Sequence, residues 1–494
     1  MSSHSFDLAA AAFTEMVRQG FHPDFPPGSD EQVARIRAAG PPALGRDVRD
    51  LRDLLWSSID NDTSRDLDQV EFAERVEGGI RVRVAVADVS ASVAKNSPLD
   101  QHAAAQTTTI YTATRNFPML PNELSTDLTS LNEGQDRAAV VLEFIVDTEG
   151  CVTHQTVYRA LVHNRAKLAY SKVGPWLEGK ADPDEKVAGS PELQRQLRLQ
   201  DEAAHALRAE RVKQGALEFN RIEADPVVID GAVHEIKAAQ HNRATDLIED
   251  FMIAANETMA ELLHSAGRSC IRRVVRSPER WSRIVELVAH YGTELPGEPD
   301  SAALNGFLRK ERETDAIHYP DLSLAIIKLL GAGEYVVASG TDNEPLGHFA
   351  LAARDYTHST APNRRFPDLV NQRIVKAMLD REPSPYTDDE LSAIATHCNL
   401  QEAAGRKVER AMQKRTAAVA LANSIGKIFR GVVTGASEKG VYVRVFNPPV
   451  EGRVIQGEHG LDVGDIVMVT LLHTDPQRAF IDFGYAKTRQ DEPG

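Results

Sequence analysis

The sequence contains few cysteines, few aromatic residues and no long apolar run. Its 494 residues include three cysteines, Cys151, Cys270 and Cys398, which are too few and too scattered for a disulfide framework or a zinc cluster. No apolar run approaches the roughly 20 residues needed to span a bilayer. The first residues, MSSHSFDLAAAAF, lack the basic region of a secretory signal. We therefore expect a cytoplasmic protein that has no membrane partner.

Basic residues are outnumbered, because 56 Lys and Arg face 72 Asp and Glu and the formal net charge is −16. Over the whole chain this balance argues against a nucleic-acid partner, but the sign of the charge changes along the sequence. Six arginines and one acid lie between Arg268 and Arg283, and seven basic residues and one acid lie between Arg406 and Arg430. Each segment is either a solvated face or a contact for a polyanion.

Three parts can be distinguished along the chain. Residues 1–45 hold two segments of helical propensity, separated by HPDFPPGSD, and are expected to form a small helical module. Residues 51–425 start with segments that alternate like strands and continue with long amphipathic segments, which predicts one large α+β domain of mixed sheet and helices. Residues 427–486 are short apolar segments with glycine turns, a spacing typical of an OB-fold barrel of about five strands.

The stretch IDNDTSRDLDQVEF, residues 59–72, concentrates carboxylates on the predicted connection between two strands. Its acidic residues are Asp60, Asp62, Asp66, Asp68 and Glu71. One interpretation is a solvated acidic turn. A second is a calcium loop, because the spacing comes near to that of an EF-hand. However, Arg65 stands where that loop needs glycine, and the flanking segments alternate like strands rather than helices.

The third interpretation is a catalytic Mg²⁺ site. Mg²⁺ takes oxygen ligands, commonly a few carboxylates together with substrate phosphates, and two such ions can activate water and stabilise the leaving oxygen of a phosphodiester. A second segment, YTHSTAPNRRFPDLVNQR at residues 356–373, places Arg364 and Arg365 side by side. The planar guanidinium suits a phosphate. The alternative for this segment is a pair of structural ion pairs.

The combination of IDNDTSRDLDQ with YTHSTAPNRRFPDLVNQR resembles the catalytic domain of the ribonuclease II / ribonuclease R family of exoribonucleases. Further blocks are similar to family blocks and follow the family order: VAVADVSASV, NFPMLPNELSTDLTSL, AKLAY, QGALEF and LIEDFMIAANETMA. The resemblance covers about residues 51–425, the RNB catalytic domain. Residues 427–486 are similar to the S1 RNA-binding domain that these enzymes carry.

The resemblance implies a hydrolytic, processive 3′→5′ exoribonuclease that uses Mg²⁺, with Mn²⁺ as a substitute, and no organic cofactor. Its partner would be the 3′ end of single-stranded RNA, with structured RNA as a further candidate, and its products 5′-nucleoside monophosphates. Asp60, Asp66 and Asp68 match the metal ligands, and Asp68 also matches the aspartate whose loss is expected to abolish cleavage but leave binding. Arg364 matches the arginine that positions the scissile phosphate, and its neighbour Arg365 is expected to contact RNA. We expect a monomer.

The same resemblance implies further RNA contacts. Tyr111 and Phe219 match the two aromatic residues that stack on the terminal bases, a contact that tolerates any base. Glu409 matches a glutamate near the floor of the RNA channel. Tyr170 and Asp250 are the candidates for contacts with the 2′-hydroxyl, which would distinguish RNA from DNA. Aromatic residues of the barrel segment are either core residues or further stacking positions: Phe429, Tyr442 and Phe446.

Two departures from the family pattern matter. The family motif has a fourth aspartate directly after the third, where this sequence has Gln69, whose carboxamide oxygen can ligate Mg²⁺ but carries no charge. One of two metals should then bind more weakly, unless Asp62 turns inward. This leaves open a second hypothesis, an RNB-type RNA-binding protein with impaired catalysis. The helical module stands where family members usually carry cold-shock barrels, and it either contacts RNA, as a helix-turn-helix-like unit, or caps the catalytic domain.

Overall fold

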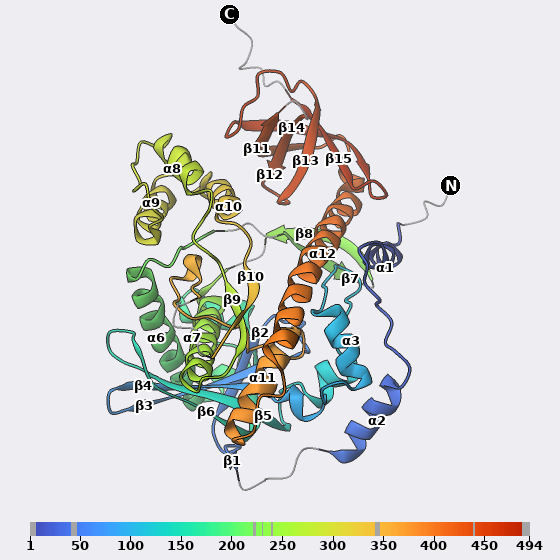
Figure 1. The fold of residues 1–494 in the computed structure, drawn as a ribbon. Helices are drawn as coiled ribbons and strands as arrows, with labels where there is room; N and C mark the ends of the chain where they lie inside the picture. The colour runs from blue at the N-terminus through green and yellow to red at the C-terminus, as the bar shows by residue number, and fades with distance from the viewer. Residues whose placement is uncertain are drawn as a thin grey trace, which may run out of the picture.

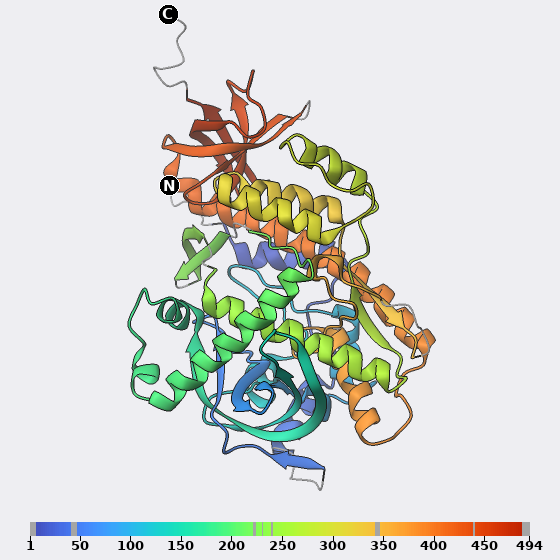
Figure 2. The same cartoon turned by 90° about the vertical axis from the view of Figure 1, so that its left-hand side faces the viewer.

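The computed structural model describes residues 6–40, 47–220, 224–229, 231–238, 241–340, 346–437 and 440–486. A curved sheet lies at one end and a small barrel at the other, and one long helix, α12 (Asp388–Leu421), runs between them (Figure 1). The α+β fold class predicted from the sequence is confirmed, as is the C-terminal barrel (Figure 2). Within the described residues no helix is both long enough and apolar enough to cross a bilayer.

The remaining elements fall into four groups. The main sheet contains β1 (Val48–Asp50), β2 (Trp56–Asp60), β3 (Gln69–Val76), β4 (Gly79–Ala87), β5 (Asp136–Val146) and β6 (Val152–Ala169). The α-helices before α12 are α1 (Leu8–Arg18), α2 (Ser29–Ala39), α3 (Pro98–Gln106), α4 (Tyr170–Leu177), α5 (Glu185–Ala188), α6 (Pro191–Lys213), α7 (Arg243–Ser265), α8 (Trp281–Ala289), α9 (Ser301–Thr314), α10 (Tyr319–Leu330) and α11 (Phe366–Leu379). Two-stranded sheets are formed by β7 (Ala224–Ile229) with β8 (Ala232–Ala238) and by β9 (Cys270–Val274) with β10 (Glu334–Ala338). The barrel contains β11 (Ile428–Ser437), β12 (Gly440–Val445), β13 (Val450–Gln456), β14 (Ile466–Asp475) and β15 (Phe480–Tyr485).

The main sheet curves until its two sides meet. Its strand order is β1-β6-β2-β3-β4-β5, and β5 pairs back onto β6. β3 and β4 form a hairpin, and Gly79, at φ +148°, allows a close approach to β5, because a side chain at this position would collide with the carbonyl of Val146. β2 meets β3 at Ser57 opposite Glu71. The acidic loop joins β2 to β3 beyond this pair.

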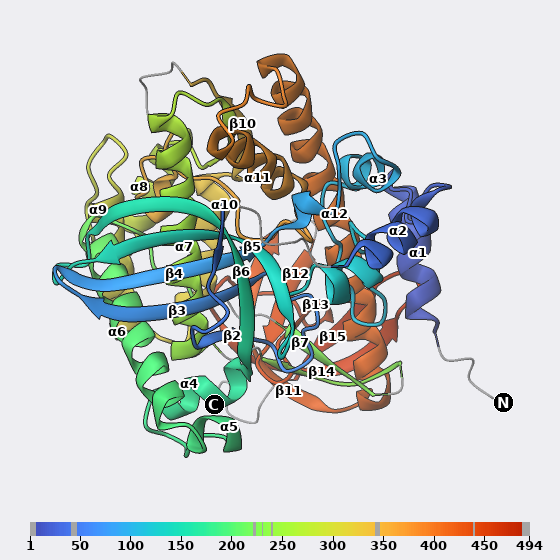
Figure 3. The same ribbon diagram turned by 90° about the horizontal axis from the view of Figure 1, so that it is seen from below.

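The strand-like alternation expected at the start of the large domain is confirmed in β4, whose alternate apolar residues are buried: Ile80, Val82, Val84 and Val86. Seen from below, the strands curve in front of α7, with α6 beside them (Figure 3). Both helices begin at side-chain caps, Ser190 for α6 and Asn242 for α7. α12 begins with a capping box in which Thr387 and Glu390 satisfy each other's backbone N–H groups.

The N-terminal helices pack on the body of the protein. Met16 of α1 and Phe21, which follows the helix, are buried in an apolar cluster with Ile110 and with Val408 of α12. α2 is joined to the start of α3, where Gln32 exchanges hydrogen bonds with the Ser97 hydroxyl and the Leu99 N–H. Both helices therefore cover the domain that follows them. The comparison with a helix-turn-helix unit stays a prediction.

The C-terminal barrel closes in the order β11-β12-β13-β15-β14. It rests on the end of α12, where Leu421 packs into the barrel core. An ion pair of 2.9 Å between Arg444 of β12 and Asp321 of α10 holds its other side. Phe429 packs edge-on against the buried ring of Phe483, whereas Tyr442 remains exposed. Tyr442 is therefore better placed than Phe429 to stack on a base.

Candidate active site

The acidic loop runs from the end of β2 to the start of β3. Asp60 ends β2, and its Oδ1 accepts hydrogen bonds from the Asn61 N–H at 2.7 Å and the Ser64 hydroxyl at 3.0 Å. Asp62, at the exposed tip, accepts from the Ser171 hydroxyl at 3.0 Å. Strands flank the loop on both sides, so the calcium-loop interpretation, which needs two helices, is wrong.

Asp66 and Asp68 lie deeper than the tip. The Tyr111 hydroxyl donates to Asp66 Oδ2 at 2.9 Å. Asp68 is 2% exposed and accepts from the Asn363 N–H and from Arg364 Nε, both at 3.1 Å. Burial raises the pKa of Asp68 to about 6, against the opposing effect of the Arg364 cation. The two segments singled out in the sequence thus meet at one place.

Arg364 is fixed by its main chain as well as by Asp68. Its carbonyl accepts from the Thr109 N–H at 3.0 Å, and the next bond of this bridge runs from the Phe366 N–H to the Thr107 carbonyl at 2.8 Å. The Arg364 side chain nevertheless stays 45% exposed. One face of the guanidinium therefore holds the buried carboxylate while the rest remains open to a ligand.

Arg365 points into a different set of contacts. At the start of α11, its Nη2 donates to Asp368 Oδ1 at 2.7 Å and to the Thr360 hydroxyl at 3.3 Å. These contacts stabilise the turn that carries Arg364. The role of Arg365 in RNA binding stays a prediction.

Tyr111, Glu409 and Tyr170 surround the same region. Burial raises the pKa of the Glu409 carboxyl, while the Tyr111 backbone N–H lowers it, so α12 contacts the loop that presents the Tyr111 ring. Burial also raises the pKa of Tyr170, and the carboxylates of Asp60 and Glu71 add to the effect. A cavity of about 570 Å³ adjoins Tyr111 and Asp66. Its lining also includes two basic side chains, Arg37 and Arg65.

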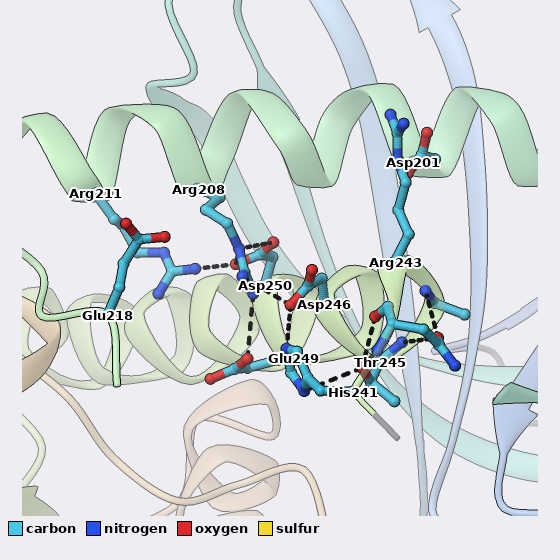
Figure 4. Close-up of polar contacts among 12 residues, drawn as sticks. Asp201, Arg208, Arg211, Glu218, His241, Arg243, Thr245, Asp246, Glu249 and Asp250 are labelled. Atoms are coloured by element: carbon cyan, nitrogen blue, oxygen red, sulfur yellow. Dashed lines mark hydrogen bonds and ion pairs between the residues drawn. The ribbon is translucent and has the colours of Figure 1, made fainter. Parts of the chain in front are cut away.

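Two predicted RNA contacts lie in other surroundings. Phe219 packs at the edge of the apolar cluster formed by α8, α9 and α10. Asp250 is 1% exposed and lies between α7 and α6, where Arg208 and Arg211 both bind its carboxylate (Figure 4). Burial raises the pKa of Asp250 to about 6, with the two arginines opposing. The structure does not bring either residue into contact with the acidic loop, and their roles stay predictions.

The ion-pair network around Asp250 includes a grouping that resembles a metal site, formed by His241, Asp246 and Glu249 (Figure 4). Arg208 already occupies it, with contacts of 2.7 Å to Asp246 and 3.1 Å to Glu249. A guanidinium among the carboxylates repels a metal cation. We therefore interpret this grouping as a structural link between α6 and α7.

Sequence reasoning gave Glu71 no role in the Mg²⁺ site. It is 0% exposed on β3, and neither of its carboxylate oxygens has a hydrogen-bond partner. Burial, together with the charge of Asp60, holds its pKa well above the usual value. An orphaned carboxylate near Asp60 fits a divalent cation, which would supply the missing partner. The signal in the sequence was an acid flanked by apolar residues, Val70 before it and Phe72 and Ala73 after it.

Comparison with known proteins agrees with this picture. Residues 48–381 match the RNB domain, and residues 427–486 match the RNase II-type exonuclease C-terminal S1 domain. The chain therefore belongs to the RNB family. Within that family it is similar to ribonuclease R of Escherichia coli (strain K12), with 30% identity over 447 residues, which cover 87% of this chain and 54% of that protein. The chain thus spans about half the length of the curated relatives it matches.

Solved structures show the same fold. Mycoplasma genitalium RNase R in complex with ribose methylated single-stranded RNA superposes with a TM-score of 0.84 at 24% identity, covering 97% of this chain and 78% of that chain. Yeast Ssd1, a pseudonuclease, superposes with a TM-score of 0.68 at 16% identity, covering 93% and 56%. The fold is therefore shared by proteins with and without nuclease activity, so the fold alone does not establish the activity.

Proposed function

We propose that this chain is a Mg²⁺-dependent, hydrolytic 3′→5′ exoribonuclease that degrades RNA processively to 5′-nucleoside monophosphates. The observation that carries the proposal is the contact between Arg364 and Asp68 in a site shared with Asp60, Asp66 and Tyr111. Carboxylates for a cation and a guanidinium for a phosphate are the parts that phosphodiester hydrolysis needs. The Tyr111 ring beside them could stack on a base of the RNA.

The substrate class comes from the relatives. The similar E. coli protein is named ribonuclease R, and the M. genitalium protein has been solved with single-stranded RNA. We propose the 3′ end of single-stranded RNA as the substrate, with structured RNA as a further candidate. We also propose that the chain acts as a monomer in the cytoplasm.

The chain's own residues would orient the substrate as follows. Asp60, Asp66 and Asp68 would hold Mg²⁺, or Mn²⁺ in its place, and the cation would polarise the phosphate and activate water. Arg364 keeps its charge at every accessible pH, and Asp68 fixes its direction. A phosphate gains negative charge in the transition state, so a fixed guanidinium stabilises that state more than the ground state. Tyr111 would hold the terminal base in register by stacking.

A labelled RNA assay tests the proposal. Poly(A) labelled at its 5′ end should shorten from the 3′ end in the presence of Mg²⁺ and release mononucleotides, and EDTA should stop the reaction. Asp68→Asn should lower the cleavage rate by on the order of 10³-fold while RNA affinity stays nearly unchanged. The reason is that Asp68 both holds the cation and orients Arg364 toward the scissile phosphate. Asp53→Asn, in an exposed residue, is the matched control. Equal loss of binding and cleavage in Asp68→Asn would mean that Asp68 is structural.

Gln69 motivates a second candidate function, an RNA-binding protein with impaired catalysis. Its carboxamide replaces a charged ligand, so one metal would bind weakly. RNA affinity without turnover in millimolar Mg²⁺ or Mn²⁺ would favour this candidate. A large gain of activity in Gln69→Asp would show that the metal had been limiting.

A further inference from the structure

Glu71 is a buried carboxylate that the fold alone does not explain. It is fully buried, and both Oε1 and Oε2 are without a hydrogen-bond partner. An ionised carboxylate is strongly disfavoured in such a position unless a cation or a set of donors binds it. Glu71 therefore either carries a proton as a structural acid or faces a cation.

The neighbouring strands offer Glu71 no basic side chain. In the sheet it lies opposite Val84 of β4 on one side and opposite Ser57 of β2 on the other. Opposed residues point to the same face of a sheet. The Ser57 hydroxyl oxygen is also buried without a partner. Orphaned oxygens from two strands thus gather on one face.

That place adjoins the acidic loop. Ser57, which lies opposite Glu71, is three residues before Asp60 at the end of β2, and Glu71 is three residues after Asp68, so the loop joins the two strands directly beyond this pair. Gln69, where the family motif has its fourth aspartate, lies two residues before Glu71 and therefore on the same face of β3. Gln69, which carries no charge, and Glu71, whose carboxylate has no partner, are therefore neighbours on that face.

We propose that Glu71 is a ligand of the divalent cation, together with Asp60, and takes the place of the aspartate that this chain lacks at position 69. The inference rests on the proposed function, since it assigns a ligand to the cation of that site. It gives the orphaned oxygens of Glu71 a partner. It also restores the number of carboxylates in the family motif, with the charge moved two residues along the strand.

Metal binding without RNA tests the inference. Mn²⁺ is titrated into the full chain, and the free ion is followed by electron paramagnetic resonance. Glu71→Gln, which has the shape of the protonated acid, should raise the dissociation constant for Mn²⁺ at least about tenfold. Glu74→Gln is the matched control, because Glu74 lies on the same strand and pairs with Arg81 and Arg83 at the surface. It should bind Mn²⁺ within about twofold of the unaltered chain.

Rescue separates a ligand from a structural acid. Gln69→Asp combined with Glu71→Gln should recover most of the lost Mn²⁺ affinity. Unchanged Mn²⁺ binding in Glu71→Gln would overturn the inference, as would failure of the double variant to recover, and RNA cleavage measured in parallel would then still report on the proposed function. An unaltered chain that neither cleaves RNA nor binds Mn²⁺ would overturn both.

A folding check completes the experiment. Thermal unfolding in EDTA should show Glu71→Gln to be at least as stable as the unaltered chain, because the substitution removes a buried carboxylate and leaves no cavity. Should Glu71→Gln fail to fold, Gln69→Asp alone carries the test. An added carboxylate beside Glu71 should tighten Mn²⁺ binding at least about threefold, and an unchanged dissociation constant would overturn the inference.

Discussion

Arg364 Nε donates to Asp68 Oδ2 at 3.1 Å, although the two residues are 296 positions apart in the sequence. Asp68 is buried, whereas nearly half of the Arg364 side chain is exposed. The pair therefore has a closed side, which fixes direction, and an open side, which can meet a ligand. Any contribution of Asp68 to catalysis then includes the orientation of Arg364.

We predict that Arg364→Lys lowers the single-turnover rate of RNA cleavage about 100- to 1,000-fold and changes RNA affinity less than about threefold. An ammonium is a point charge and lacks the planar fork that binds a carboxylate and a phosphate at once. Rapid-quench kinetics and filter binding measure the two quantities. Arg75→Lys, at an exposed ion pair with Glu202, should behave like the unaltered chain. Parallel losses of rate and affinity in Arg364→Lys would contradict the assigned role.

A second prediction separates the ring of Tyr111 from its hydroxyl. Tyr111→Ala should weaken binding of a short oligoribonucleotide by about 1–3 kcal/mol, because the base loses its stacking partner. Tyr111→Phe keeps the ring and loses only the bond to Asp66, so its affinity should remain within about threefold. Fluorescence anisotropy in EDTA gives both values. Similar losses in the two variants would show that the hydroxyl carries the effect.

A third prediction concerns the support of the Tyr111 loop by the N-terminal helices. Phe21 is 1% exposed and contacts the cluster that contains Ile110. Phe21→Ala should lower the free energy of unfolding by about 3–5 kcal/mol. It should also speed amide hydrogen exchange over residues 107–118. Val17→Ala, in a side chain that is 54% exposed, is the control and should change neither quantity.

The pH dependence of stability follows from His102. This side chain is 5% exposed beside the Phe25 ring, and burial lowers its pKa from 6.5 to about 4. As the pH falls, His102 therefore becomes protonated near pH 6.5 in the unfolded chain but only near pH 4 in the folded chain. Stability from the neutral imidazole is complete above pH 6.5 and is lost as the pH falls toward 4, by on the order of 3 kcal/mol.

Urea unfolding at pH 7.5 and pH 5 measures this effect. His102→Gln should lose clearly less stability between the two values than the unaltered chain, because its side chain does not titrate. His264→Gln, at the exposed end of α7, is the control. An equal loss in His102→Gln and in the unaltered chain would show that another group is responsible.

Local patterns predicted the elements of the fold well. The alternation of apolar residues at the start of the large domain indicated strands, and β4 is one of them, because burial of one face is a local property. The acidic loop and the arginine segment were both recognised, but only the fold shows that Asp68 and Arg364 share a hydrogen bond. Separate segments do not encode their distance.

The role of Glu71 could not be predicted for a related reason. Its burial depends on β2 and β4 enclosing β3, a long-range arrangement that no window of sequence contains. The same holds for the surroundings of Asp250, where Arg208 and Arg211 from the neighbouring helix bind its carboxylate. The residue type of Asp250 suggested a polar contact, and the packing of α6 against α7 determines that the partners are arginines.

The bridge that joins Thr109 to Arg364 has a consequence for how RNA would advance. Main-chain hydrogen bonds connect the segment before Tyr111 directly to the turn of Arg364, so the stacking ring and the guanidinium are carried by two backbone segments that are joined to each other. Under the proposed function, the distance between the stacked base and the bound phosphate is fixed by this backbone. The length of each step along the strand would then be set by the polypeptide and would be the same for all four bases.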